Sequence, residues 1–284
     1  MGTSNLYKGP KGSSLLPVDY TDETDSPSVD TAIDETPDKE GLPGDEVTVG
    51  DDNLEQEEPQ REDTSLISWT QAKRTFTNQI GKRSPNVRLI VKTYTKASGG
   101  YKHAAATSTS SKRVARGMIS LFSGAPDTIR RRIEQIGIVF VGRSTQEIFN
   151  DIYSYLCTGA ATRADALADK ALSQTFSELF ESERMSEQSM EVFTPELLEF
   201  LVSHFIANSI YYKLLNEVSF GELTSDKDNS DIAKIEDELK TFIDGLVDGR
   251  VPEHLHEGIT HDEVGKMVDD LYEDCYKVME GLAE

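Results

Sequence analysis

The group best placed for chemistry in this sequence is the α-amine of Gly2. Removal of Met1 is expected because the next residue is as small as glycine, and it would leave a free amine at the tip of a short arm. The arm, residues 1 to 17, carries Lys8 and Lys11 and no acidic residue, although acids dominate the residues that follow. A basic terminus ahead of an acidic stretch indicates a linear segment that another protein binds.

Other reactive side chains give weaker indications of a site. Cys157 lies in an apolar run without a nearby base, which favours a buried thiol over a nucleophile. His254, His256 and His261 could hold a divalent metal, but they lack thiolate partners and an HxxxH spacing, so solvent-facing histidines are favoured. The GxSxG, HExxH, Rossmann and Walker patterns are absent from the sequence. We therefore expect no metal, no cofactor and no catalytic activity.

The charge is segregated along the chain, whose formal net charge is -22. Residues 18 to 63 sum to -16, residues 64 to 142 to +12, and residues 143 to 284 to -20. The total excludes a protein whose whole surface attracts nucleic acid or anionic membrane. Residues 18 to 63 are poor in apolar residues, which predicts a disordered acidic linker that either tethers the arm or screens the basic segment.

The basic segment is a candidate interaction surface. Its cations could bind phosphates, with Trp69, Tyr94 and Tyr101 available for stacking, or they could dock an acidic protein surface, including the acidic half of this chain. We favour the protein contact. The candidate residues are Lys73, Arg74, Arg88, Lys92, Lys112, Arg113, Arg116, Arg130, Arg131 and Arg132.

Apolar spacing after residue 64 predicts an all-α fold, a helical bundle preceded by the long acidic disordered region. The expected helices include one ended by Gly81, one from Val87 to the Gly99–Gly100 pair, one from Ala104 to Phe122 with Lys112, Arg113 and Arg116 on its wetter side, and one ending near Gly137. Only Ile138 to Val141 has the pattern of a strand.

The later helices are expected around residues 147–157, 164–180, 195–218, 231–246 and 261–282, with the one from Pro195 at the centre of the bundle. Capping patterns at Ser144, Thr194 and Thr260 predict three helix starts. We expect a main helical domain over residues 64–222 and a C-terminal helical pair over residues 223–284, which packs on the main domain or forms a separate module.

The sequence has no apolar stretch long enough for a membrane span and no signal-peptide core. The two cysteines, Cys157 and Cys275, show no close pairing. We expect a cytoplasmic protein with reduced thiols.

Several segments resemble the QatB family of bacterial Qat antiphage defence systems. The opening MGTS, the stretch from Tyr7 to Gly12 and Leu15-Leu16-Pro17 carry the specific part of the resemblance. It continues through Arg74 to Thr77, the helix ending in Gly99–Gly100, and residues 205–208. The resemblance implies a non-catalytic subunit that acts beside an ATPase, a TatD-like nuclease and QatC, an enzyme similar to the deazaguanine synthase of queuosine biosynthesis.

That last partner implies a role for the arm. Enzymes of the QatC type activate a deazaguanine carboxylate with ATP and attack it with an amine, and an α-amine of pKa about 7.7 to 8.0 is partly neutral near pH 7. We expect Gly2 to replace ammonia as the modification site. The expected partner-binding residues are Thr3, Ser4, Tyr7, Lys8, Gly9, Pro10, Lys11, Gly12, Leu15, Leu16 and Pro17.

The favoured hypothesis is an antiphage adaptor whose arm is bound, and modified at Gly2, by a QatC-like enzyme. The alternative is a nucleic-acid-binding protein that uses residues 73–132. A scaffold protein with the same layout is a third, weaker possibility.

Overall fold

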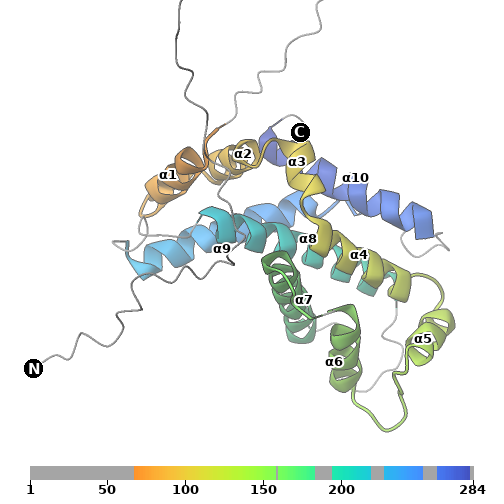
Figure 1. Ribbon diagram of the computed structural model, residues 1–284. Helices are drawn as coiled ribbons and strands as arrows, with labels where there is room; N and C mark the ends of the chain where they lie inside the picture. The colour runs from red at the N-terminus through yellow and green to blue at the C-terminus, as the bar shows by residue number, and fades with distance from the viewer. Residues whose placement is uncertain (1–66, 158, 183–193, 219–226, 252–260, 282–284) are drawn as a thin grey trace, which may run out of the picture. The chain divides into compact units, whose positions relative to one another are not determined.

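The computed structural model describes residues 67–157, 159–182, 194–218, 227–251 and 261–281. These residues belong to one compact unit that spans Pro59–Glu284. Within the described ranges the chain forms ten α-helices and no strand, which confirms the predicted all-α class (Figure 1). The arm and the acidic segment lie outside the described residues.

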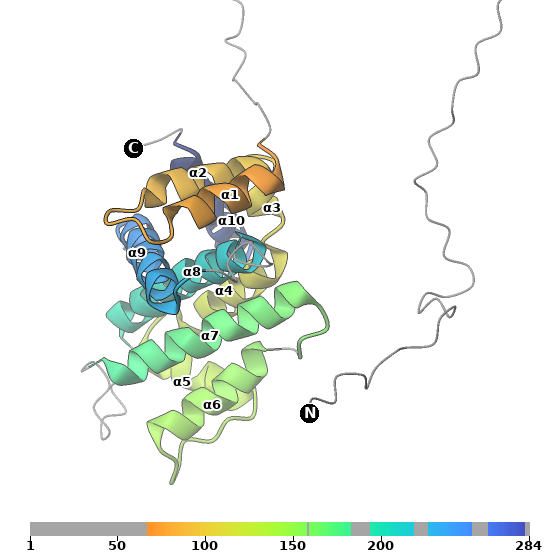
Figure 2. The same cartoon turned by 90° about the vertical axis from the view of Figure 1, so that its left-hand side faces the viewer.

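The helices form a bundle in which α1 and α2 lie at one end and α5 and α6 at the other (Figures 1 and 2). In chain order they are α1 (Trp69–Gln79), α2 (Val87–Ala97), α3 (Tyr101–Ala106), α4 (Thr109–Phe122), α5 (Pro126–Gln135), α6 (Thr145–Leu156), α7 (Arg163–Glu181), α8 (Pro195–Val218), α9 (Asn229–Val247) and α10 (His261–Glu280).

The first two helices follow the predicted apolar spacing and begin at polar caps. The Ser68 side chain accepts a hydrogen bond from the Gln71 amide (3.2 Å), and the Asn86 side chain accepts one from the Leu89 amide (3.0 Å). Gly81 follows α1 with φ of +81°, a backbone conformation that glycine adopts without strain. The start and stop signals of these helices are therefore local.

The helix predicted from Ala104 to Phe122 is interrupted, so this prediction is wrong. The structure has two helices, α3 and α4, separated at Thr107 and Ser108. The Ala104 carbonyl, which an uninterrupted helix would offer to the Ser108 amide, accepts hydrogen bonds from the Ser108 hydroxyl and from the Lys213 ammonium, each 3.0 Å long. A side chain from a distant helix thus competes for the backbone acceptor and stabilises the break.

The strand predicted at Ile138 to Val141 is also absent. These residues form the connection between α5 and α6, without a paired strand among the described residues. The alternating pattern has another cause, because Ile138 and Phe140 are buried while Val139 and Val141 are exposed. Alternate burial along a single connection between helices gives the same period of two as a strand.

Helix α8 is the central helix of the bundle, as predicted. It packs against α7, α4, α9 and α1, and the side chains from Val202 to Ile210 are buried except for two partly exposed positions. The predicted caps are confirmed where they are described. Ser144 and Glu147 form a capping box at α6, and the Thr194 hydroxyl accepts a hydrogen bond from the Leu197 amide at α8 (3.3 Å).

The last two helices pack on different parts of the bundle. Helix α9 packs along α8, and α10 lies across α2, α3 and α4. The Glu280 side chain accepts a hydrogen bond from the Tyr101 amide (2.8 Å), which joins the end of α10 to the start of α3. The predicted domain boundary near residue 223 and the capping residue Thr260 lie outside the described residues.

Candidate functional site

The predicted basic patch is distributed over helices at both ends of the bundle (Figures 1 and 2). Its members lie on four different helices. Lys73 and Arg74 lie on α1, Arg88 and Lys92 on α2, Lys112, Arg113 and Arg116 on α4, and Arg130, Arg131 and Arg132 on α5.

The cations of α4 are paired with acids of the C-terminal half. Lys112 and Arg116 both contact the Asp269 carboxylate of α10, at 2.8 and 2.7 Å, and Arg113 contacts Asp165 of α7 at 3.0 Å. Lys112 is only 8% exposed, so its predicted place on the wetter side of the helix is wrong. The reason is that α10 covers this side of α4 and brings its own carboxylate.

The three arginines of α5 make contacts within α5 and to its neighbour. Arg130 pairs with Glu134 (3.3 Å), and Arg131 donates to a backbone carbonyl one turn earlier (3.2 Å). Arg132 reaches the backbone carbonyl of Ser120 in α4 (3.1 Å). Arg132 thus acts as a tie between α4 and α5.

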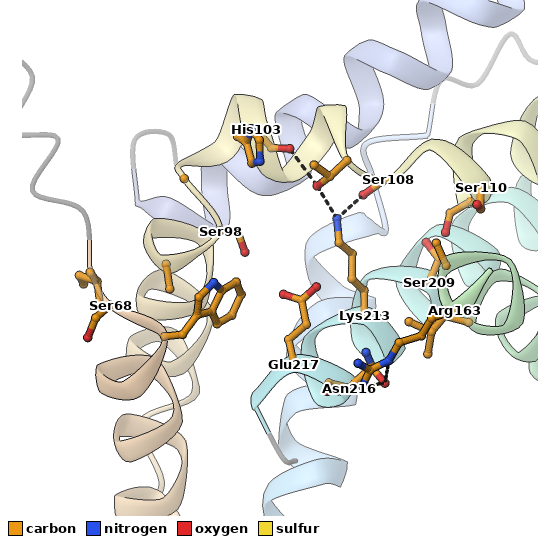
Figure 3. Close-up of a pocket in the computed structure, with 18 residues that line it drawn as sticks. Ser68, Ser98, His103, Ser108, Ser110, Arg163, Ser209, Lys213, Asn216 and Glu217 are labelled. Carbon is orange, nitrogen blue, oxygen red and sulfur yellow. Dashed lines mark hydrogen bonds between the residues drawn. The ribbon is translucent and has the colours of Figure 1, made fainter. Parts of the chain in front are cut away.

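A cleft of about 1020 Å³ opens between the start of α1, the end of α2, the α3–α4 break and the helices α7 and α8 (Figure 3). Ligand pockets commonly measure about 300 to 1,000 Å³, so this cleft has room for a small molecule or a peptide segment. Ile67, the first described residue, lines it. Its polar lining includes Ser98, His103, Thr107, Ser108, Ser110, Ser111, Arg163, Ser209, Lys213, Asn216 and Glu217.

Lys213 of α8 extends to the α3–α4 break along one side of the cleft (Figure 3). Its ammonium donates to the Ala104 carbonyl (3.0 Å), the Thr107 hydroxyl (2.9 Å) and the Ser108 hydroxyl (3.1 Å). An ammonium has three donors, so all three are used. Burial lowers the pKa of Lys213 to about 8, against the opposing charge of nearby Glu217.

Glu217 lies one helical turn beyond Lys213 and points into the cleft (Figure 3). Burial raises the pKa of Glu217, although the charges of Lys213, Arg163 and Lys73 act in the opposite direction. Trp69 lines the same cleft and is 38% exposed. The centroid of its ring lies 6.0 Å from the centroid of the Tyr94 ring. The cleft therefore offers a carboxylate and an indole to whatever enters it.

Two buried tyrosines of α10 support the cleft from behind. The Tyr272 hydroxyl lies 2.7 Å from the Ser209 hydroxyl, and the Tyr276 hydroxyl lies 3.4 Å from that of Ser108. Burial raises the pKa of Tyr276 to about 12 and also raises the pKa of Tyr272, so both hydroxyl groups stay protonated near neutral pH. These contacts hold the serines of the cleft wall in place.

Residues 99–279 match the sequence model of a family described as "Qat anti-phage system associated protein QatB". The matched residues include α3 to α9 and all of α10 except its last residue, and they make up more than half of the chain. The chain belongs to the QatB family. It is thus a component of an anti-phage Qat system, and the other components of that system are its partners. No curated protein and no solved structure is found to match the chain.

The match to QatB covers part of the sequence resemblance. The Gly99–Gly100 pair and residues 205–208 fall inside the matched range. The arm from Gly2 to Pro17 falls outside both the matched range and the described residues, so Gly2 and the partner-binding residues remain predictions.

In this QatB-family chain a second polar cluster joins α7, α8 and α9. Glu178 contacts the His204 ring at 2.8 Å, the Asn208 amide at 3.2 Å and the Lys240 ammonium at 3.7 Å. Burial alone would raise the pKa of Glu178, but these partners lower it overall. Sequence reasoning missed this cluster because its members come from three helices.

The thiols of the QatB-family chain are held in the protonated form. Burial raises the pKa of Cys157 and of Cys275 to about 12 each. The described residues contain no group of three or more His, Cys, Asp or Glu side chains placed to hold a metal. His254 and His256 lie outside the described residues, and of His261 only the backbone is described. None of the described helices is long and apolar enough to cross a membrane.

Proposed function

We propose that this QatB-family protein is a non-catalytic, cytoplasmic adaptor whose N-terminal arm is bound by a QatC-like enzyme and modified at Gly2. The helical unit docks further Qat components, which include an ATPase and a TatD-like nuclease. The observation that carries the proposal is the abrupt change from the basic arm to the acidic segment at Pro17. A segment of this kind is suited to recognition as a linear motif by a partner.

The modification would be an acylation of the arm. The enzyme activates a deazaguanine carboxylate with ATP, the neutral Gly2 amine attacks the activated carbonyl carbon, an amide bond forms, and the bond to the nucleotide leaving group breaks. The amine loses its proton to solvent. Glycine suits this step because it has no side chain to obstruct the approach to the carbonyl.

The chemistry of the helical unit supports a non-catalytic role. Cys157 and Cys275 have pKa values of about 12, so little thiolate is available near neutral pH. The pKa of Lys213, about 8, keeps most of this group protonated at pH 7, and three hydrogen bonds to the α3–α4 break hold the ammonium in a structural role.

The nucleic-acid alternative has less support from the contacts of the basic segment. Lys112, Arg113 and Arg116 already pair with Asp165 and Asp269. Phosphate binding by these cations would have to displace partners held in place by helix packing.

The test is the mass of the N-terminal peptide of this chain, expressed alone and together with the other Qat genes. We expect an added mass on Gly2 only in co-expression, and loss of both the added mass and QatC-like binding when residues 2–17 are deleted. An unmodified Gly2 in a stable co-purified complex would contradict the modification and would support a protein that only docks its partners. Salt-sensitive DNA binding that increases on deletion of residues 18–63 would instead support the alternative.

A further inference from the structure

We propose that the groove formed by α2, α9 and the end of α10 docks an acidic amphipathic helix of another Qat component. The inference rests on the proposed adaptor role but concerns a surface of the helical unit and not the arm. We refer to this surface as the α2–α9 groove.

The α2–α9 groove has a volume of about 960 Å³, and apolar and polar side chains line it in similar measure. Val91, Leu246 and Met279 form buried parts of the floor. Leu89, on the adjoining turn of α2, is 41% exposed, and Phe242 of α9 is partly exposed. Apolar side chains in a groove between helices can receive the apolar face of an amphipathic helix.

The charged residues that the structure places in the lining of the α2–α9 groove are positive. Arg88, Lys92 and Arg250 contribute to its lining, and among the described residues no acidic side chain lines it. This is unusual in a chain that has 51 acidic and 29 basic residues. Within the described part of the chain, Arg88 and Lys92 form no ion pair, in contrast to the cations of α4. Charge complementarity therefore favours an acidic partner.

The spacing of the cations matches a helical partner. Arg88 and Lys92 are four residues apart on α2, so they share one face with about 5 to 6 Å between their Cβ atoms. Carboxylates one turn apart on a partner helix have the same separation. Gly245 of α9 has no side chain, and a Cβ atom built there would meet no atom within 4 Å, so the partner backbone can approach closely.

Two other occupants fit the groove less well. A second copy of this chain has a net charge of -22, and two such chains repel each other. The acidic residues 18–63 have the right charge but include only one aromatic residue, Tyr20, and so offer few apolar anchors. A partner helix that carries both acidic side chains and apolar anchors is the better occupant.

A photo-crosslinking experiment identifies the occupant. p-Benzoylphenylalanine replaces Thr241, an exposed residue at the groove, in the full chain expressed with the other Qat components, and the crosslinked peptide is sequenced by mass spectrometry. We expect one peptide from another component, with apolar residues at i, i+3 or i+4 and acids beside them. Crosslinks only to residues 18–63, only to a second copy, or to no protein would overturn the proposal.

Charge reversal then tests the contact itself. The Arg88→Glu, Lys92→Glu double variant should weaken binding of the crosslinked component at least about tenfold, and reversal of the partner's acids to lysine should restore it. The matched control is Lys82→Glu, Arg83→Glu, which reverses two exposed cations that do not line the groove. Equal loss in the control, or no loss in the groove variant, would contradict the proposal.

A steric variant covers the case in which charge reversal disturbs folding. Gly245→Trp should fill the groove and block the partner, whereas Gly245→Ala leaves most of the volume free and should bind normally. Circular dichroism verifies that both variants are folded. Retained binding in Gly245→Trp would rule out this groove as the docking site.

The two proposals fail separately. Deletion of residues 2–17 removes the arm and should leave the crosslink at Thr241 intact. Groove variants should leave the added mass on Gly2 intact. If the groove variants bind the crosslinked component normally, the groove proposal is wrong. If the wild type carries no added mass on Gly2 in co-expression while the groove variants still lose binding, the arm proposal is wrong.

Discussion

Lys213 of α8 donates a hydrogen bond of 3.0 Å to the carbonyl of Ala104 at the end of α3. The two residues are separated by 109 positions in the sequence. The contact replaces the backbone hydrogen bond that would continue α3 into α4, and it forms part of the wall of the cleft. A break in a helix is thereby tied to the central helix of the bundle.

Replacement of Lys213 by methionine should lower the free energy of unfolding by about 2 kcal/mol. The variant loses three hydrogen bonds from a charged donor and leaves the Ala104 carbonyl with one partner fewer. Urea denaturation monitored by circular dichroism measures the change. The control is Lys266→Met, at an exposed position of α10. A loss of the same size in the control would show that the contacts of Lys213 are not the cause.

The stability of the wild type should depend on pH through Lys213. Its pKa is about 8 in the folded chain and 10.5 ordinarily, so between pH 8 and 10.5 the unfolded chain binds more protons than the folded one. The free energy of unfolding therefore gains a term that rises with pH across this window, and Lys213→Met lacks that term. The tyrosines titrate in both proteins, so their contribution cancels in the difference between the two free energies of unfolding. Parallel pH profiles would contradict the lowered pKa.

Asp269→Asn should destabilise the junction of α4 and α10. The change removes the carboxylate shared by Lys112 and Arg116, and Lys112 is only 8% exposed, so a largely buried cation loses its partner. We expect a loss of about 1 kcal/mol, or a Tm lower by about 2 to 4 °C, in calorimetry. Asp270→Asn, at the exposed neighbouring position, should have no measurable effect. An unchanged Tm in both variants would mean that the pairs contribute nothing to stability.

Replacement by alanine should change the stability of the protein in opposite directions at two glycines. Gly245 lies inside α9, where a Cβ atom would meet nothing within 4 Å, so Gly245→Ala should stabilise by up to about 1 kcal/mol. Gly81 has φ of +81°, and a Cβ atom there would lie 3.2 Å from the Asp231 carboxylate, so Gly81→Ala should destabilise by about 1 kcal/mol. Thermal denaturation of both variants measures the difference, and a shift of the same sign in both would contradict the backbone assignment.

Much of the helical structure could be predicted from local patterns. The stripe of Ala72 and Phe76, the capping box of Ser144 and Glu147, and the cap of Thr194 each depend on residues within a few positions of one another. Propensity, periodicity and capping act at this range, which is why they are visible in the sequence.

The candidate site could be predicted only in part. Arg88 and Lys92 were included in the basic patch, and they do line the α2–α9 groove. The predicted patch also contains Lys112. Its pairing with Asp269 could not be predicted from the sequence, because the two residues lie on different helices that meet only in the folded chain. Lys213 and Glu217 were missed because a lysine and a glutamate one turn apart are also typical of a solvated helix face.

The all-α class, the central place of α8, the segregation of charge and the family resemblance can all be predicted from the sequence, because each follows from composition or from residues close together in the chain. The end of α3, the pairing of the α4 cations with acids and the position of Arg88 and Lys92 at a groove depend on how the helices pack. Those outcomes depend on contacts such as Lys213 to Ala104, made between helices far apart in the chain, and only the packing of those helices brings the partners together.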